Sequence, residues 1–164
     1  MITIRDGCPD DLPRILEITN HAILTGTALW TISPATLETR SAWMAERQGA
    51  GFPILVVEQD GLVHGFGSYG PFRPHDGFRH TVEHSLYIDE AAQRRGYGNA
   101  MLGALVAHAK SAGVHAMIGG IAAENTGSIA LHERHGFSVA GTLPETGRKF
   151  DRWLDLVFMH RLLG

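Results

Sequence analysis

The segment QRRGYG, residues Gln93–Gly98, lies between a predicted strand at 81–88 and a predicted helix at 96–112. The first N–H groups of a helix have no partner within it, and the helix dipole makes this end positive, so it attracts a phosphate. The two glycines of the segment let the main chain close around an anion, and its two arginines add positive charge. The segment therefore predicts an anion site at a strand-to-helix junction, although the same residues also fit an ordinary surface turn.

Two familiar phosphate-binding loops do not fit this segment. It lacks the Gly-Lys-Ser/Thr ending of a Walker loop. It has only two of the three glycines of the dinucleotide fingerprint, and it lies in the middle of the chain. The surrounding sequence therefore has to indicate which phosphate compound binds there.

Hydrophobic periodicity, β-branched runs and Gly/Pro punctuation predict the elements on both sides of the segment. Asp60-Gly61 marks a hairpin turn, Ser33-Pro34 is interpreted as the start of the second helix, and Gly65 and Gly67 predict a close approach by another part of the chain. The predicted strands are 2–5, 53–58, 62–69, 81–88, 114–121, 137–141 and 153–160, and the predicted helices are 9–23, 33–49, 96–112 and 125–135.

The order β-α-α-β-β-β-α-β-α-β-β combines antiparallel hairpins with one βαβ crossover around the helix at 96–112. It predicts one α/β domain spanning residues 1–164, built as an α/β sandwich on a mixed sheet rather than as a doubly wound sheet. The length of 164 residues is sufficient to bury a core of useful size.

The composition excludes several functional classes. A net charge of -3 provides no basic surface for nucleic acid or for an anionic membrane. No apolar run reaches the roughly 20 residues that span a bilayer. The single cysteine, Cys8, allows no internal disulfide, so we expect a cytoplasmic protein in which Cys8 is a small packing residue.

The pattern Gln-x-x-Gly-x-Gly between a strand and a helix resembles the acetyl-CoA motif of the GNAT acetyltransferase superfamily. The run Ala123–Phe137 is similar to the second cofactor-side segment of that superfamily. Within it, TVEHS at 81–85, Phe78-Arg79 and GRKFDRWLDL at 147–156 resemble the phosphinothricin and methionine sulfoximine acetyltransferase subfamily. The resemblance covers essentially the whole chain. It implies the GNAT fold, a central and mostly antiparallel sheet with splayed strands flanked by helices.

The resemblance implies acetyl-CoA as co-substrate and assigns residues to it. Main-chain groups of 86–88 are expected to bind the pantetheine arm and the thioester carbonyl, and Asn125 the CoA arm, although Asn125 is also an ordinary helix N-cap. The predicted cofactor-binding residues are Leu86, Tyr87, Ile88, Arg94, Arg95, Gly96, Tyr97, Gly98, Asn99, Asn125 and Ser128.

Acetyl transfer to an amine requires a base, an oxyanion donor and, in some enzymes, an acid. Glu83 is the candidate base, because partial burial raises a carboxyl pKa; the alternatives are a solvated edge-strand charge and a partner for an arginine. His132 occupies a helix position where many members of the superfamily have a Tyr near the thiol, and it is the candidate acid; the alternative is a packed histidine. Cys8 has no evident base nearby, so we expect direct transfer without an acyl-enzyme.

The acceptor is expected to be a small amino-acid-like amine whose carboxylate is held by Arg73 and Arg79; the alternative is that these two loop arginines are solvated. The resemblance also implies a homodimer with a contact around Gly147–Trp153. No metal is expected, because no cysteine or carboxylate cluster completes a ligand set. The predicted substrate-binding residues are Thr27, Trp30, Arg73, Pro74, His75, Arg79, Glu83, His84, Ser85 and Lys149.

The leading hypothesis is therefore an acetyl-CoA-dependent N-acetyltransferase for phosphinothricin, methionine sulfoximine or methionine sulfone, with herbicide resistance as a consequence. One alternative is an acetyltransferase for another amine, such as a protein N-terminus, a polyamine or an aminoglycoside. The other is a non-catalytic acyl-CoA-binding sensor, which would keep the phosphate loop but lack a base.

Overall fold

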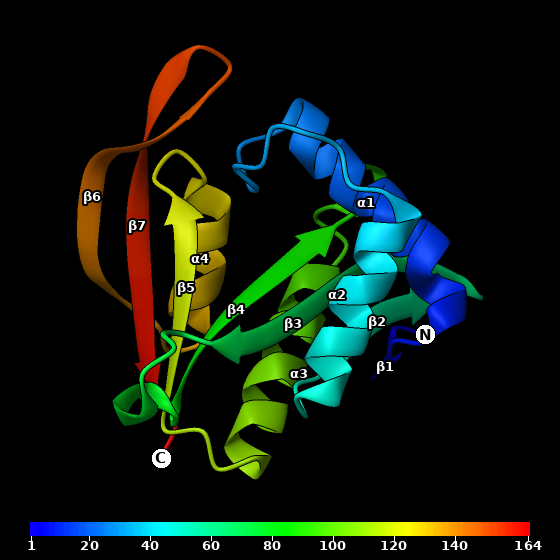
Figure 1. The fold of residues 1–164 in the computed structure, drawn as a ribbon, viewed down its shortest axis with the longest axis horizontal. Helices are drawn as coiled ribbons and strands as arrows, with labels where there is room; N and C mark the ends of the chain where they lie inside the picture. Colours follow the sequence, from blue (N-terminus) through cyan, green and yellow to red (C-terminus); the bar gives the residue numbers. More distant parts are fainter.

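The computed structural model describes residues 1–164 and contains one seven-stranded sheet of order β1-β2-β3-β4-β5-β7-β6 (Figure 1). All neighbouring strands are antiparallel except β4 and β5, which the crossover through α3 makes parallel. The strands are β1 (Thr3–Asp6), β2 (Ile54–Gln59), β3 (Leu62–Pro71), β4 (Thr81–Ile88), β5 (Ala116–Ala122), β6 (Ser138–Lys149) and β7 (Arg152–Leu162). The helices are α1 (Leu12–Thr25), α2 (Leu37–Gly49), α3 (Tyr97–Ser111) and α4 (Thr126–Arg134), with short 3-10 turns at Pro9–Asp11, Asp76–Phe78 and Glu90–Ala92.

The centre of the sheet opens where β4 and β5 separate. Their register runs only from Thr81↔Ala116 to His84↔Gly119, and the two strands diverge beyond that point (Figure 1). Residues 85–88 stay paired with β3 on one side. On the other side, the main-chain groups of this half of β4 have no strand partner and are available to a ligand.

Each face of the sheet has its own core. Leu102, Leu105 and Met117 belong to the core beneath α3, whereas Ile15, Met44 and Phe66 belong to the core beneath α1 and α2. Successive residues of a strand alternate between these two faces. A methyl group at Gly67 would lie 2.9 Å from Leu105 Cδ1 of α3, and one at Gly65 would lie 2.6 Å from Tyr87 O of β4, so the predicted close approaches are contacts with α3 and with β4.

The second helix begins later than predicted. The sequence favoured Ser33-Pro34 as its start, but α2 begins at Leu37, and the side chain of Thr36 accepts a hydrogen bond from the Thr39 amide at 3.1 Å. The Asn20 side chain explains the delay, because it donates to Ala35 O at 3.0 Å and accepts from Ala35 N at 2.7 Å. These two bonds use the main chain of Ala35 and keep it outside the helix.

The last hairpin is longer than predicted. The strand expected at 137–141 continues as β6 to Lys149, and the segment Gly147–Trp153 is the tip of the β6–β7 hairpin. Its turn residues Phe150 and Asp151 have φ angles of 52° and 57°, as a two-residue hairpin loop requires. Neither residue is a glycine, so the sequence contained no turn signal at this place.

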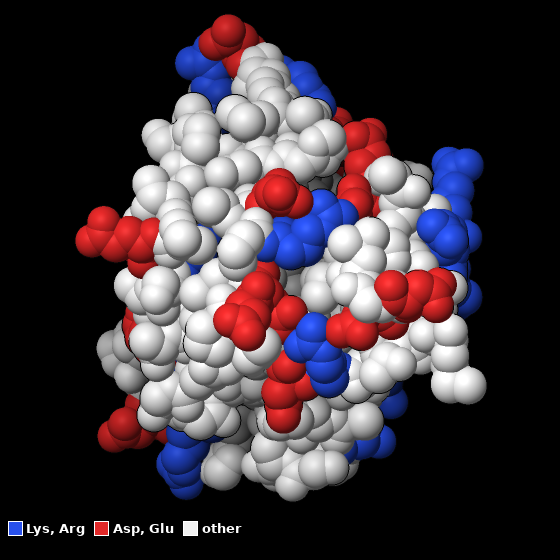
Figure 2. Space-filling view, turned by 90° about the vertical axis from the view of Figure 1, so that its right-hand side faces the viewer, with Lys and Arg blue, Asp and Glu red and all other residues white.

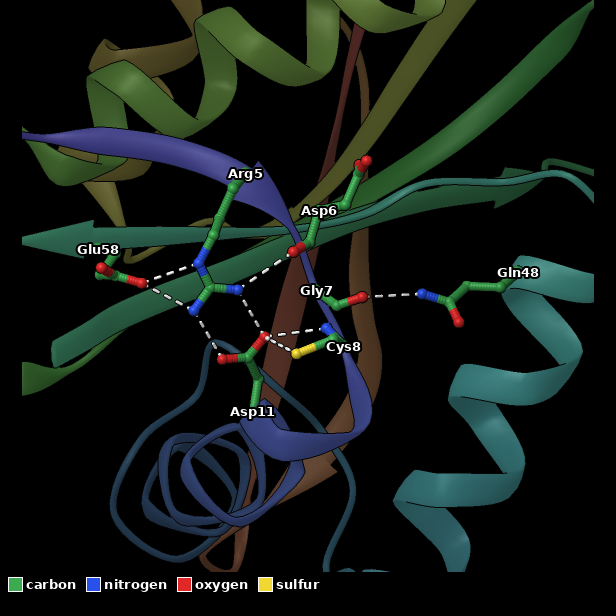
Figure 3. Close-up of polar contacts among 7 residues, drawn as sticks. All are labelled: Arg5, Asp6, Gly7, Cys8, Asp11, Gln48 and Glu58. Atoms are coloured by element: carbon green, nitrogen blue, oxygen red, sulfur yellow. Dashed lines mark hydrogen bonds and ion pairs between the residues drawn. The ribbon is translucent and has the colours of Figure 1, made fainter. Parts of the chain in front are cut away.

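An ion-pair cluster fixes the first strand against the start of α1 (Figure 3). Arg5 donates to both carboxylate oxygens of Asp11, at 2.8 and 2.9 Å, and to Glu58 at 2.8 Å. Cys8 is exposed, and its thiol lies 3.4 Å from the Asp11 carboxylate. The expectation that Cys8 is a packing residue is therefore wrong.

Acidic and basic side chains are interspersed on the face shown in Figure 2, without a broad area of one sign. None of the helices combines the length and the apolar character that crossing a bilayer requires. The structure contains no cluster of three or more His, Cys, Asp or Glu residues that could hold a metal ion.

Candidate active site

Two clefts meet where β4 leaves β5. The larger has a volume of about 980 Å³ and extends along the end of β4 to the starts of α3 and α4. The smaller, of about 360 Å³, lies on the side of α2 and contains Glu83. Ala28 and Tyr87 line both clefts, so a group bound in one can reach a group bound in the other.

The floor of the larger cleft is the start of α3. Gly96 is the N-cap residue, with a φ of +90°, and Arg94 also has a positive φ, 61°. No side chain caps this helix, so its first amide N–H groups remain free. An N-terminus with free amides and a glycine at the bend is suited to hold a phosphate.

The structure brings together nearly all of the predicted cofactor-binding residues. Arg95 is the exception, because it does not line the cleft and its guanidinium lies over the Tyr97 ring at 5.8 Å. Tyr97 offers only its main chain, since its buried side chain donates to Gln59 at 3.0 Å. The residues that line the cleft as predicted are Leu86, Tyr87, Ile88, Arg94, Gly96, Tyr97, Gly98, Asn99, Asn125 and Ser128.

The start of α4 closes the other wall of the larger cleft. Asn125 lines the cleft and also caps the helix, because its side-chain oxygen accepts a hydrogen bond from the Ser128 amide at 3.1 Å. Both interpretations of Asn125 are therefore compatible with its position. Arg134, which the sequence analysis did not select, lines the same cleft with an exposed side chain.

Glu83 is half-buried in the smaller cleft. Burial raises the pKa of its carboxyl group, and the nearby positive charge of Arg73 partly offsets this increase. Glu83 faces Gly120 across the opening of the sheet, where a methyl group would lie 3.3 Å from Glu83 Oε1. The glycine therefore leaves room beside the carboxylate, and the raised pKa suits a base that works near neutral pH.

The predicted substrate-binding residues divide into two groups. Trp30, Glu83, His84 and Ser85 line the smaller cleft. The other predicted residues line neither cleft: Thr27, Arg73, Pro74, His75, Arg79 and Lys149. Within the second group, Thr27 donates to Glu124 at 2.6 Å, Arg73 lies over the Phe72 ring at 4.5 Å, and Pro74, His75 and Arg79 occupy an exposed loop.

Lys149 lies outside both clefts, and its ammonium group is bound by main-chain carbonyls. Its side chain is 4% exposed, and its ammonium group donates to Gly26 O and Leu29 O, each at 2.6 Å, and approaches Ala22 O at 3.5 Å. These contacts occupy the three donors of the ammonium group. Lys149 thus fastens the α1–α2 loop to the β6–β7 hairpin, and the prediction that it binds substrate is not supported.

His132 is also placed differently from the prediction. It is 2% exposed, lines neither cleft, and its Nδ1 lies 2.7 Å from Ser128 O, so Nδ1 must carry the proton. Its Nε2 then accepts a hydrogen bond from His84 Nε2 at 3.2 Å. Because burial also lowers the pKa of His132, the neutral ring has no proton directed at a thiolate, and the assignment of His132 as the acid is corrected.

Two adjacent glycines in β5 make room for the His84–His132 pair on one face of the sheet and for Glu83 on the other. A methyl group at Gly119 would lie 2.9 Å from His84 Nε2, and one at Gly120 would approach the Glu83 carboxylate on the opposite face. Glycine weakens a strand, so two in succession indicate that the space is needed. The pair Gly119-Gly120 is the sequence signal for this space.

A model of the family described as "Acetyltransferase (GNAT) family" matches residues 15–137. The chain belongs to this family. A relative from Salmonella typhimurium, named L-methionine sulfoximine/L-methionine sulfone acetyltransferase, is 44% identical over 158 residues, which cover 96% of this chain and 92% of the relative. The expected membership in the GNAT family is thereby confirmed.

Solved GNAT structures have the same fold. A phosphinothricin acetyltransferase from Sinorhizobium meliloti, solved in complex with acetyl-CoA, superposes with a TM-score of 0.97 at 35% identity, covering 99% of this chain and 89% of that one. A structure described as a ribosomal-protein-alanine N-acetyltransferase from Brucella melitensis also has a TM-score of 0.97, at 45% identity, covering 98% and 99%. The predicted GNAT fold and acetyltransferase activity are confirmed, with acetyl-CoA as co-substrate.

One basic residue of the smaller cleft in this GNAT chain was not among the predicted site residues. Arg47 of α2 lines the cleft together with Glu83. Its helix also places Arg40 and the buried Met44 three to four residues apart along one face. Charged residues at the spacing of a buried helix face were the signal that could have identified it.

Proposed function

We propose that this GNAT acetyltransferase transfers the acetyl group of acetyl-CoA directly to the amine of a small amino-acid-like acceptor. Methionine sulfoximine, methionine sulfone and phosphinothricin are the acceptor types, because proteins so named are similar to this chain over nearly its whole length. The observation that carries the proposal is the position of Glu83 in a small cleft that meets the larger one at Ala28 and Tyr87.

In this proposal, the pyrophosphate of acetyl-CoA binds at the start of α3, and Asn125 and Ser128 line the path of the pantetheine arm. The thioester lies in the opening between β4 and β5. Unpaired main-chain N–H groups within 86–88 stabilise the tetrahedral oxyanion. This arrangement brings the acetyl group to the junction of the two clefts, where the acceptor amine can reach it.

Glu83 acts as the general base, directly or through a water molecule. It removes a proton from the ammonium group, and the neutral amine attacks the thioester carbonyl. The nitrogen of the tetrahedral intermediate then loses its second proton, the C–S bond breaks, and the leaving thiolate takes up one proton to become the CoA thiol. The only cysteine, Cys8, lines neither cleft, which supports direct transfer over an acyl-enzyme.

A panel of amines in a free-thiol release assay tests the acceptor class. We expect turnover with methionine sulfone, methionine sulfoximine and phosphinothricin, and at most slow turnover with a peptide that begins with alanine or with a polyamine. Turnover with the peptide alone would favour the N-terminal acetyltransferase. Turnover with no amine would favour the acyl-CoA sensor.

We also propose that residues 1–164 act as one domain and that two copies form a homodimer through the β6–β7 hairpin. Phe150 and Trp153 are 53% and 57% exposed at its tip, and Val139 and Leu143 are exposed along β6. Apolar side chains exposed along the edge strand β6 and at the tip of the hairpin support a contact with a second copy.

A further inference from the structure

The acceptor cleft contains a guanidinium group without an acidic partner. Arg47 is half-buried and lines this cleft, but it forms no ion pair and its side chain donates no hydrogen bond to the protein. Arg5, Arg14 and Arg152, in contrast, are each paired with carboxylates. A partly buried charge without a partner is costly, which indicates that its partner is supplied by a ligand.

Gly70 explains how Arg47 reaches the cleft. A methyl group at Gly70 would overlap Arg47 Nη1 and lie 2.8 Å from Arg47 Cζ, so the guanidinium occupies the space that a side chain would fill. Gly70 pairs with Glu83 across β3 and β4. Directly opposite residues of an antiparallel pair project to the same face with Cα atoms roughly 5 Å apart. Arg47 and Glu83 therefore lie on the same side of the sheet and line the same cleft.

A second arginine adds positive charge behind the first. Arg40, two helical turns before Arg47, lies over the Trp43 ring at 4.8 Å, and its buried Nε has no hydrogen-bond partner. Burial lowers the pKa of both guanidinium groups. Tyr87 opposes this effect for Arg40 and Glu46 opposes it for Arg47, while the charge of Arg47 lowers the pKa of Arg40 further. An anion in the cleft would relieve both groups.

Glu83 and Arg47 together match the two charged ends of an amino acid. The carboxylate attracts an ammonium group, and the guanidinium fork binds a carboxylate through two parallel hydrogen bonds. No ion pair joins Glu83 to Arg47, so each remains available to the ligand. Of the two groups predicted for this role, Arg73 acts on the pKa of Glu83 through its charge but does not line the cleft, and Arg79 does neither.

We propose that Arg47, held in the space left open by Gly70, binds the α-carboxylate of the acceptor and makes the enzyme specific for free amino acids. The inference rests on the proposed function, because it names the acceptor group that faces Glu83. Arg40 strengthens the field around Arg47 without contacting the substrate.

The test compares L-methionine sulfone with its α-carboxamide, which keeps the amine and the side chain but lacks the negative charge. In Arg47→Gln, we expect kcat/KM for the acid to fall roughly 10- to 100-fold, as the loss of a charge-assisted hydrogen bond implies, and kcat/KM for the carboxamide to change by less than about 3-fold. Arg47→Lys should recover part of the preference, since it keeps the charge but not the fork. The KM for acetyl-CoA should stay unchanged.

Gly70→Ala tests the same anchor without removing Arg47, because the added methyl group displaces the guanidinium from its place. It should reduce the preference for the acid over the carboxamide, whereas Lys110→Gln, an exposed control on α3, should leave the preference intact. The melting temperature of Arg47→Gln should not fall, since an unpaired charge is removed. A lower melting temperature together with equal losses on both substrates would assign Arg47 a structural role and overturn the proposal.

A measurement of amino-acid binding, without turnover, distinguishes the role of Arg47 from the proposed acetyltransferase function. Wild-type enzyme with CoA should bind methionine sulfone in calorimetry, and Arg47→Gln should bind it at least about 10-fold more weakly. If wild type released no thiol from acetyl-CoA with any amine but still bound the amino acid through Arg47, the proposed function would fail and the anchor would stand. If wild type turned over both substrates equally well, or bound no amino acid, the anchor would be wrong.

Discussion

The chemistry of the site depends at the residue scale on the ionisation of Glu83. Its carboxyl must be deprotonated to accept a proton, so kcat/KM should decline as the pH falls through its pKa. Burial raises this pKa, and Arg73 partly opposes the increase. In Arg73→Gln the opposing charge is absent, so the acid limb of the kcat/KM profile should move to higher pH.

Arg79→Gln is the comparison variant for this measurement, because Arg79 has no part in the pKa shift of Glu83. Its acid limb should coincide with that of wild type. A limb that moves to lower pH in Arg73→Gln, or that does not move, would show that Glu83 does not control the profile.

His84 predicts an acid-sensitive stability. Burial lowers the pKa of His84 to about 3, and the neighbouring His132 adds to this effect. Between this pKa and that of the unfolded chain, the native ring stays neutral while the unfolded one takes up a proton. Stability contributed by the neutral ring is complete above the unfolded pKa of about 6.5 and is lost as pH falls from there toward the folded pKa. Between pH 7 and pH 5 the loss should be about 2 kcal/mol in denaturant titrations.

His84→Gln is the matched variant, because an amide can donate to His132 Nε2 without titrating. Its free energy of unfolding should depend less on pH over the same interval. Parallel pH dependence in the two proteins would contradict the neutral pair.

At the scale of the elements, the α1–α2 loop forms one wall of the acceptor cleft, and contacts with the β6–β7 hairpin hold this loop in place. Lys149 donates to carbonyls of this loop, and Trp30 of the loop lies against Gly147. Lys149→Met should leave Gly26 O and Leu29 O without a buried donor, which costs about 1–3 kcal/mol each. The variant should melt at lower temperature and show a higher KM for the acceptor.

Lys110→Met, on the exposed side of α3, controls for loss of a lysine elsewhere. It should change neither the melting temperature nor the KM. A Lys149→Met enzyme with normal stability and a normal acceptor KM would contradict the role of Lys149 as a fastener.

The order of the elements and the crossover around α3 followed from hydrophobic periodicity, and so did the span of β4. The start of α2 did not, because it depends on Asn20, which is distant in sequence and bonds the Ala35 main chain. The walls of the cofactor cleft at 86–99 and 125–134 were largely predictable, since each is one continuous segment. The third wall, formed by residues 14–28 of α1 and the loop after it, was not predicted. The spacing of Arg40, Met44 and Arg47 indicated charge on a buried helix face, but the place of Arg47 in the cleft of Glu83 depends on the tertiary approach of α2 to Gly70.

The proposed homodimer belongs to the scale of the whole molecule. A solution mass near twice 17.8 kDa is expected from light scattering. Trp153→Glu places a charge on the exposed hairpin and should shift the mass toward the monomer. A monomeric wild type at micromolar concentration would contradict the dimer, without affecting the assignment of the clefts.

The role of Glu83 as the general base is tested most directly by replacing its carboxylate with an amide of nearly the same shape. Glu83→Gln should bind acetyl-CoA as wild type does in calorimetry, while its kcat with methionine sulfone falls by roughly 10²- to 10⁴-fold, the usual contribution of a general base. Turnover within a few-fold of wild type, with acetyl-CoA affinity unchanged, would show that Glu83 is not the base.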